Sequence, residues 1–198
     1  MAKVEDGLAR FYALSDGIFA VIITVMVLAF KSPTGRDFPA LLSPWPDLVS
    51  YAVSYAFIAV VWLNHHEVLR YAQRLTGTLA LANFANLFAI SFIPFATAWL
   101  AESKMATFPL TLYALVFLLV QGTYMVLMWE SFSHLPDGSD SQPRKWQWFR
   151  AWAMLVVFLI AAAGVIMPSF LRLILLASFL ILYCRPDPFR RARRANST

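Results

Sequence analysis

The sequence predicts an all-α integral membrane protein with six transmembrane helices per subunit. Its composition lies outside the range of ordinary soluble domains, because 60% of its 198 residues are hydrophobic, 14% are charged and the mean hydropathy is +0.64. The apolar residues also gather into stretches of roughly 20 residues, the length that a helix needs to cross a hydrocarbon core. Composition and segment length therefore indicate the same fold class.

The predicted spans form a single six-helix transmembrane domain, residues 1–198, and are separated by polar or proline-rich connections. Four prolines between residues 31 and 47 prevent a continuous helix after the first span. The short connection 102–107 makes the third and fourth spans an antiparallel hairpin, and Pro94 is expected to bend the third. The sixth span corresponds to roughly 24 Å of helix, which is short for a bilayer. The spans are approximately residues 10–31, 46–70, 77–101, 106–131, 147–167 and 169–184, and a basic cytoplasmic tail, 185–198, follows.

The distribution of basic residues predicts the orientation of these spans. Six spans place both termini on one side, and that side then holds 12 of the 16 lysines and arginines. By the positive-inside rule, both termini are cytoplasmic in a multi-pass protein of a prokaryotic cell membrane. The tail 185–198 is expected to lie against anionic lipid headgroups, and nucleic acid is not an expected partner. The opposite side receives Lys31, Arg36, Lys104 and Arg172.

The residue types available argue against an enzyme and against a bound cofactor or structural metal. The chain has one cysteine, Cys184, and three histidines, so an intrachain disulfide and a cysteine-rich metal site are excluded. It also lacks a serine nucleophile elbow, carboxylates paired at a useful spacing and a glycine-rich phosphate loop. A first span without a signal-peptide cleavage pattern is expected to be retained as a helix.

The first span combines an apolar stripe with an acidic residue on its other side. At 100° per residue, one stripe contains Leu14, Gly17, Val21, Thr24, Val25 and Leu28, whereas Asp16 falls nearly opposite Val21. A carboxylate in such an apolar segment needs a protein or water partner, because its burial in lipid is costly. The stripe itself is compatible with a pore, with contact between symmetry mates, or with ordinary packing against lipid.

A second polar cluster lies at the cytoplasmic end of the second span, in the run Trp62-Leu-Asn64-His65-His66-Glu. The adjacent histidines lie about 100° apart on a helix, which is poor spacing for a shared metal ion. Both polar clusters are near the same membrane face. We therefore expect Arg10, Ser15 and Asp16 to form hydrogen bonds with Asn64, His65 or His66 and to fix the first span against the second.

Two motifs together give this sequence a family resemblance. The run Arg10-Phe-Tyr-Ala-Leu-Ser-Asp16, followed by Ala20 and Thr24, and the run from Trp62 to His66 resemble the signature of the transmembrane protein 175 family of potassium channels. The chain is similar to the prokaryotic branch of that family in length and in its six spans. The resemblance covers at least the first three spans, and more loosely the remainder.

The resemblance implies a homotetramer in which the first helix of each subunit lines a central pore without a carbonyl-lined filter. The permeant ion would be K⁺, and the constricting residues would be Val21, Val25 and Leu28, with Thr24 supplying a hydroxyl layer. The resemblance also assigns a structural polar network that holds the pore helix. Its members would be Arg10, Ser15, Asp16, Trp62, Asn64, His65 and His66.

The sequence departs from the family pattern at two positions. Leu14 stands where phenylalanine is usual, and Val21 stands where a larger isoleucine or leucine is common. Four valines fill less of a pore than four isoleucines, so the constriction would be wider. The functional prediction is a potassium-selective or weakly selective cation leak channel with a hydrophobic constriction. The alternatives are a proton-coupled or electrogenic small-ion transporter and a membrane assembly protein that conducts no ions.

Overall fold

The fold was analysed in a computed structural model that describes residues 2–29, 35, 40, 45–72, 74–133, 135 and 141–178. Within these residues the structure contains helices and turns but no β-strand, so the all-helical prediction is confirmed. The basic tail and Cys184 lie outside the described residues. The helices are α1 (Ala2–Met26), the 3-10 turn η1 (Val27–Ala29), α3 (Trp45–Leu69), α4 (Gly77–Ile90), α5 (Ile93–Glu102), α6 (Thr107–Ser133), α7 (Ser141–Ala163) and α8 (Ser169–Ala177).

Five segments of the described chain are long and apolar enough to cross a membrane. The sixth predicted span, 169–184, extends past the described residues, and the structure describes its first part as the short helix α8. The predicted third span is present as two helices, α4 and α5. The candidate spans are Gly7–Ala29, Trp45–Leu69, Gly77–Glu102, Thr107–Ser133 and Arg144–Ala163.

Local chemistry explains where several of these helices begin and end. Thr76 caps α4, because its Oγ1 accepts a 3.1 Å hydrogen bond from the backbone N–H of Leu79. The third span breaks at Ser91 and Phe92, and Pro94 then occupies the first turn of α5, where a proline costs no helical hydrogen bond. The tight turn between α5 and α6 places Lys104 and Met105 at positive φ, 52° and 62°.

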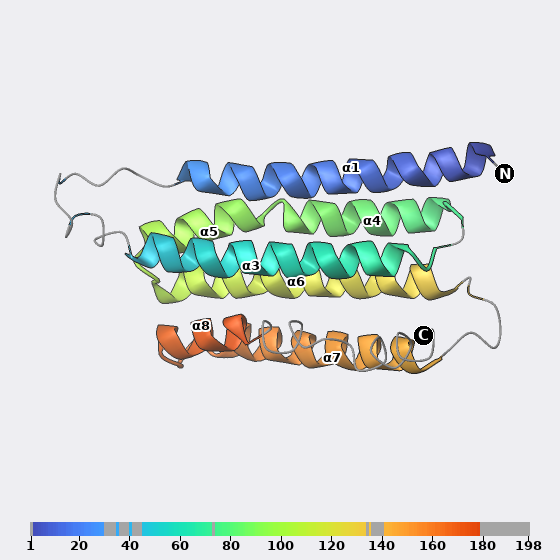
Figure 1. Ribbon diagram of the computed structural model, residues 1–198. Coiled ribbons are helices and arrows are strands. Elements are labelled where there is room, and N and C mark those ends of the chain that lie inside the picture. Colours follow the sequence, from blue (N-terminus) through green and yellow to red (C-terminus); the bar gives the residue numbers. More distant parts are fainter. Residues whose placement is uncertain are drawn as a thin grey trace, which may run out of the picture.

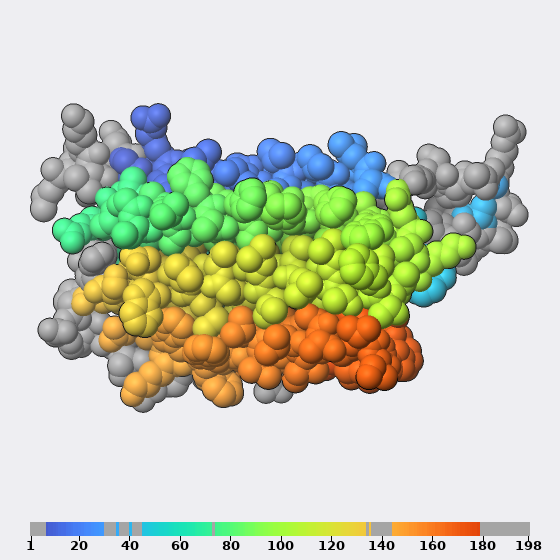
Figure 2. Space-filling model, turned by 180° about the vertical axis from the view of Figure 1, so that it is seen from behind, coloured from blue at the N-terminus to red at the C-terminus, as the bar shows by residue number. Residues whose placement is uncertain are grey.

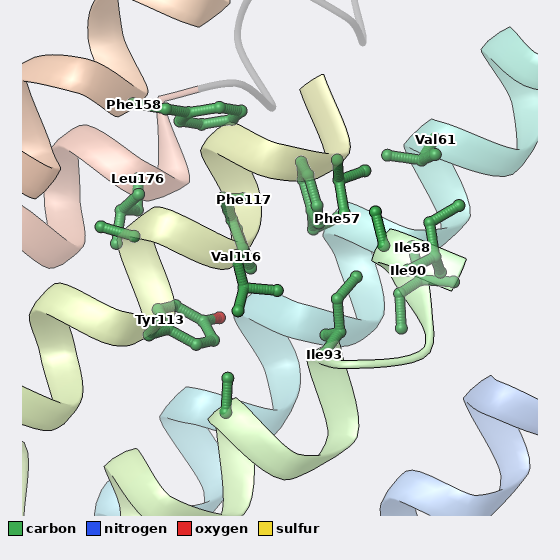
Figure 3. Packing of buried hydrophobic residues seen from close by; sticks show 14 of the residues in the cluster. Phe57, Ile58, Val61, Ile90, Ile93, Tyr113, Val116, Phe117, Phe158 and Leu176 are labelled. Atoms are coloured by element: carbon green, nitrogen blue, oxygen red, sulfur yellow. The ribbon is translucent and has the colours of Figure 1, made fainter. Parts of the chain in front are cut away.

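Figure 1 shows the long helices running side by side, with α1 at one edge and α7 and α8 at the opposite edge. Helices α3, α4, α5 and α6 lie between them, and the view from behind in Figure 2 shows α4, α5 and α6 between α1 and α7. The main core fills the space between these helices. Phe57 of α3 stacks on Phe117 of α6 with ring centroids 3.8 Å apart, and Phe158 of α7 meets both rings edge-on (Figure 3). The edge helix α1 therefore packs on the rest of the subunit through one face alone.

Candidate functional site

The apolar stripe predicted on α1 and η1 is exposed along its whole length. Leu14 is 47% exposed, Val21 59% and Val25 45%, and Leu28, in η1, reaches 78%. Gly17 and Thr24, the remaining members of the stripe, are exposed as well. No other part of the described subunit covers this stripe, which runs along the outer edge of the helix bundle. The stripe therefore faces whatever surrounds a single subunit.

The opposite face of α1 packs into the subunit. Its buried residues recur at helical spacing and contact α3, α4 and α5. They are Phe11, Ser15, Phe19, Ile22 and Met26. Because one face is buried and the other is bare, the rotation of α1 about its own axis is fixed by packing. Sequence periodicity and burial agree on which residues belong to each face.

Ser15 is the one polar member of this buried face, and a chain of hydrogen bonds satisfies it. Nε2 of His65 donates to Oδ1 of Asn83 over 2.6 Å, and Nδ2 of Asn83 donates to Oγ of Ser15 over 2.9 Å. The Ser15 hydroxyl then donates to the carbonyl of Phe11 at 3.2 Å. Because Oδ1 of Asn83 can only accept a hydrogen bond, while Nδ2 of Asn83 donates to Ser15, the proton of the His65 imidazole is assigned to Nε2. The chain links α3, α4 and α1 inside the bundle.

A second contact between α1 and α3 involves the carboxylate that the sequence singled out. The indole Nε1 of Trp62 donates to Oδ1 of Asp16 over 2.8 Å. Farther along the same interface, the hydroxyl of Tyr12 donates to the backbone carbonyl of Leu69 at 2.9 Å. Phe19, which is buried on the same helix, meets the ring of His65 of α3 edge-on, with centroids 5.1 Å apart. The hydrogen bonds of Tyr12, Ser15 and Asp16, together with the contact of Phe19, thus fix the angle of α1 relative to α3 and α4.

The remaining residues of the predicted network lie in different places. Asn64 joins α3 to α7, because its Oδ1 accepts a 3.2 Å hydrogen bond from Nη2 of Arg150. His66 is exposed, and its ring centroid lies 6.2 Å from that of Trp62. Arg10 is exposed on α1 and has no partner among the described residues. The structure therefore joins His65, and not His66, to the buried chain. Arg10 lies outside that chain within a single subunit.

Sequence reasoning missed two buried arginines that hold the helices together. Arg150 was counted among the cytoplasmic charges, yet it is 8% exposed and bonded to Asn64. Arg172 was placed on the external side, yet it is fully buried and bonded to carbonyl oxygens of Ala161 and Thr107 and to Oγ1 of Thr111. An arginine within an apolar segment is a signal of such a role, because a charge there needs hydrogen-bond partners.

The described residues contain no group of three or more histidine, cysteine or acidic side chains placed to hold a metal ion. The arrangement is instead a bare apolar helix face, interrupted by one hydroxyl, on a helix whose rotation is fixed from behind. Oγ1 of Thr24 donates to backbone carbonyls of its own helix, those of Ala20 at 3.0 Å or Val21 at 2.9 Å. Its lone pairs therefore remain free on the exposed face, where oxygen is available to a cation.

Comparison with known proteins gives consistent matches. The family model described as "Endosomal/lysosomal potassium channel TMEM175" matches residues 10–94, which hold most of α1 and the whole of α3 and α4. A potassium channel of Chryseobacterium sp. (strain P1-3) is 33% identical over 118 residues, 60% of this chain and 62% of the relative. The zebrafish protein named endosomal/lysosomal proton channel TMEM175 is 30% identical over 105 residues, 50% of this chain and 19% of the relative. The matched region thus spans less than two thirds of either relative.

A solved structure extends the likeness over almost the whole chain. The crystal structure of a lysosomal potassium-selective channel TMEM175 homologue from Chamaesiphon minutus superposes with a TM-score of 0.75. It is 25% identical in sequence, and the match covers 90% of this chain and 97% of that one. The matching family is one of ion channels and not of enzymes. The chain is therefore similar to the TMEM175 family in sequence over residues 10–94, and it matches the fold of the Chamaesiphon homologue over 90% of its length.

Proposed function

We propose that this protein is a cation channel with K⁺ as the favoured ion, in which α1 helices from four copies line one central pore. The observation that supports this proposal most directly is the bare stripe on α1, which has the residues and the rotation that a pore lining requires. The names of the Chryseobacterium relative and of the Chamaesiphon homologue agree with K⁺ as the ion. The protein would span a prokaryotic cell membrane with both termini in the cytoplasm.

The chemistry of the stripe favours passive flow through a hydrophobic constriction. Rings of Val21, Val25 and Leu28 from four copies would give an apolar passage, and such a passage controls ions through its width and through dewetting. Thr24 would add one ring of hydroxyl oxygens within it. This arrangement differs from a filter built of backbone carbonyls, because every α1 carbonyl up to this point remains within a helix. Selectivity would then depend on the size of the side chains at residue 21.

The polar contacts behind the stripe support the same proposal. A pore of this kind fails if its helices rotate, since a rotation of 100° replaces one lining residue with its neighbour. The bonds from Asp16 to Trp62 and from Ser15 to Asn83 oppose such a rotation. Arg10, which is exposed on the same helix, is available to contact a second subunit. The network would thus act in positioning and assembly, and ions would pass only along the stripe.

The decisive experiment is the reversal potential of purified protein in a planar bilayer with K⁺ on one side and Na⁺ on the other. We expect a reversal potential displaced toward that of K⁺, and we expect Val21→Ala to raise conductance and reduce the displacement. Val156→Ala is the matched control, because Val156 is similarly exposed, 50% against 59% for Val21, but lies on α7 at the other edge. Absence of current, or equal effects of the two variants, would overturn the proposal.

Protons are a second candidate for the permeant ion. The zebrafish relative carries the name proton channel, whereas the Chryseobacterium relative carries the name potassium channel. A pH gradient imposed with equal K⁺ on both sides separates the two ions. A reversal potential that follows the proton gradient would identify proton flow, whereas a reversal potential near zero would leave K⁺ as the main permeant ion.

A further inference from the structure

An apolar groove opens between α6 and α7, at the edge of the molecule opposite α1 (Figure 1). It has a volume of about 600 Å³ and is lined by Met125, Val126 and Trp129 of α6 and by Trp148 and Trp152 of α7. The rings of Trp129 and Trp148 meet edge-on with centroids 6.4 Å apart. Three tryptophans thus form the walls of a single groove. No role in the proposed pore accounts for them.

The groove lies at one end of the membrane-spanning region. Trp129 is one turn from the end of α6 at Ser133, and Trp148 is two turns from the start of α7 at Ser141. Both helices contain candidate spans, and tryptophan concentrates where the hydrocarbon meets the headgroups. The outer side of the groove is uncovered by described residues, since Trp129 is 63% and Trp152 55% exposed. In Figure 2, α6 and α7 run side by side on the visible face.

Basic side chains stand beside the apolar walls. Arg144 and Lys145 precede Trp148 by four and three residues, so they lie on the same face of α7, about one turn closer to the helix end. Lys145 is exposed, and Arg144 is partly buried. Among the described residues, the acidic residue nearest in sequence is Glu130, which follows Trp129 on α6, while Asp137 and Asp140 of the connection between α6 and α7 lie outside the described residues. Arg150 does not contribute to the groove, because its guanidinium is bonded to Asn64 of α3.

We propose that this groove binds one anionic phospholipid of the adjoining leaflet. Its acyl chain would lie against the three tryptophans and Val126, and its phosphate would meet Lys145 and Arg144. An apolar wall with a basic pair one turn beyond it matches the two ends of such a lipid, whereas a zwitterionic lipid gains less from the basic pair. Binding requires only that α6 and α7 span a bilayer. It does not depend on the proposed conduction.

Tryptophan fluorescence provides a direct test, because the groove carries its own reporters. The full-length protein is reconstituted in phosphatidylcholine vesicles that contain a small fraction of brominated phosphatidylglycerol or of brominated phosphatidylcholine, and bromine quenches only tryptophans in contact with it. We expect the anionic lipid to quench at lower mole fraction. The preference should fall by about fivefold for each basic residue removed, the ratio that corresponds to about 1 kcal/mol.

Four variants, one of them a control, test the location of the site. Arg144→Gln with Lys145→Gln should abolish the preference, while Arg70→Gln with Arg74→Gln removes the same charge at the same end of the bundle and should preserve it. Lys145→Gln alone should halve the logarithm of the preference for the anionic lipid. Because Lys145 is exposed, we do not expect this change to disturb folding. Replacing Trp129, Trp148 and Trp152 with phenylalanine should remove the lipid-selective part of the quenching.

Two outcomes would overturn the proposal. Equal quenching by the two lipids would mean that the groove holds ordinary annular lipid without headgroup selection. Absence of quenching, together with disulfide cross-linking of a Val126→Cys variant between two copies, would mean that a second copy of the chain covers the groove. Neither outcome affects the reversal-potential experiment, so failure of the lipid site and failure of the channel proposal are distinguishable.

Discussion

The indole of Trp62 and the carboxylate of Asp16 form a 2.8 Å hydrogen bond that joins α3 to α1. The sequence leaves open how an acidic side chain is accommodated in so apolar a helix, and this contact gives the answer. The partner of the carboxylate is a neutral N–H donor and not a basic residue. A hydrogen bond from an N–H to a carboxylate is stronger than a hydrogen bond between two neutral groups. The pair lies on the face of α1 turned toward α3, away from the exposed stripe.

Trp62→Phe is expected to loosen α1 without altering the stripe. The change keeps an aromatic ring but removes the donor to Asp16, so we expect a loss of about 1 kcal/mol in resistance to unfolding in detergent. If α1 lines a shared pore, the fraction of assembled protein in size-exclusion chromatography should also fall. Trp45→Phe is the control, because Trp45 is 58% exposed at the start of α3, far from Asp16. Equal effects of the two changes would refute a specific role for the bond.

Ser15 and Asn83 are expected to be energetically coupled. Each single change to alanine breaks the 2.9 Å bond between them, so the second change should cost less than it does in the native background. Coupling energies for polar pairs in membrane proteins average about 0.6 kcal/mol and reach about 1.7 kcal/mol. The full burial of both side chains favours the upper part of that range. A double-mutant cycle of unfolding in mixed detergent measures the coupling directly.

The control for this cycle pairs Ser15 with a polar residue elsewhere in the bundle. Asn86 is equally buried on the same helix as Asn83, but it donates to the carbonyl of Val120 at 3.1 Å and to Thr123 Oγ1 at 3.0 Å, on α6. Changes at Ser15 and Asn86 should therefore be additive. A coupling near zero between Ser15 and Asn83 would show that the hydrogen-bond chain contributes no more than its separate members.

The exposed stripe was predictable from the sequence because it depends on helical periodicity alone. Gly17, Val21 and Leu28 are spaced so that one face is apolar in any α-helix, and the structure leaves that face bare. The choice between His65 and His66 was not predictable, since both are near α1 and only the packing of α4 decides which of them is buried. The burial of Arg150 likewise depends on how α7 docks on α3, which no local pattern specifies.

Arg172 is expected to be essential for the docking of α8. Its guanidinium donates to Ala161 O at 2.8 Å, to Thr107 O at 3.4 Å and to Thr111 Oγ1 at 2.8 Å, and thereby joins α8 to α6 and α7. Arg172→Met removes all three of these hydrogen bonds and should lower stability by about 3 kcal/mol. Arg172→Lys should restore little, because an ammonium lacks the planar fork that reaches three acceptors. Limited proteolysis after α8, compared with the native protein, measures undocking.

Val21→Thr separates the polarity of the constriction from its width. Threonine has nearly the shape of valine, so four copies would leave the passage equally wide but would add four hydroxyl groups that hold water. If dewetting limits flow past Val21, conductance should rise severalfold in single-channel recordings while the K⁺ over Na⁺ preference changes little. Val21→Ile makes the opposite test, because it narrows an apolar ring and should lower conductance. If width alone controlled the current, Val21→Thr would conduct as the native protein does, and the hydroxyl of Thr24 would then be the polar group that matters to a passing ion.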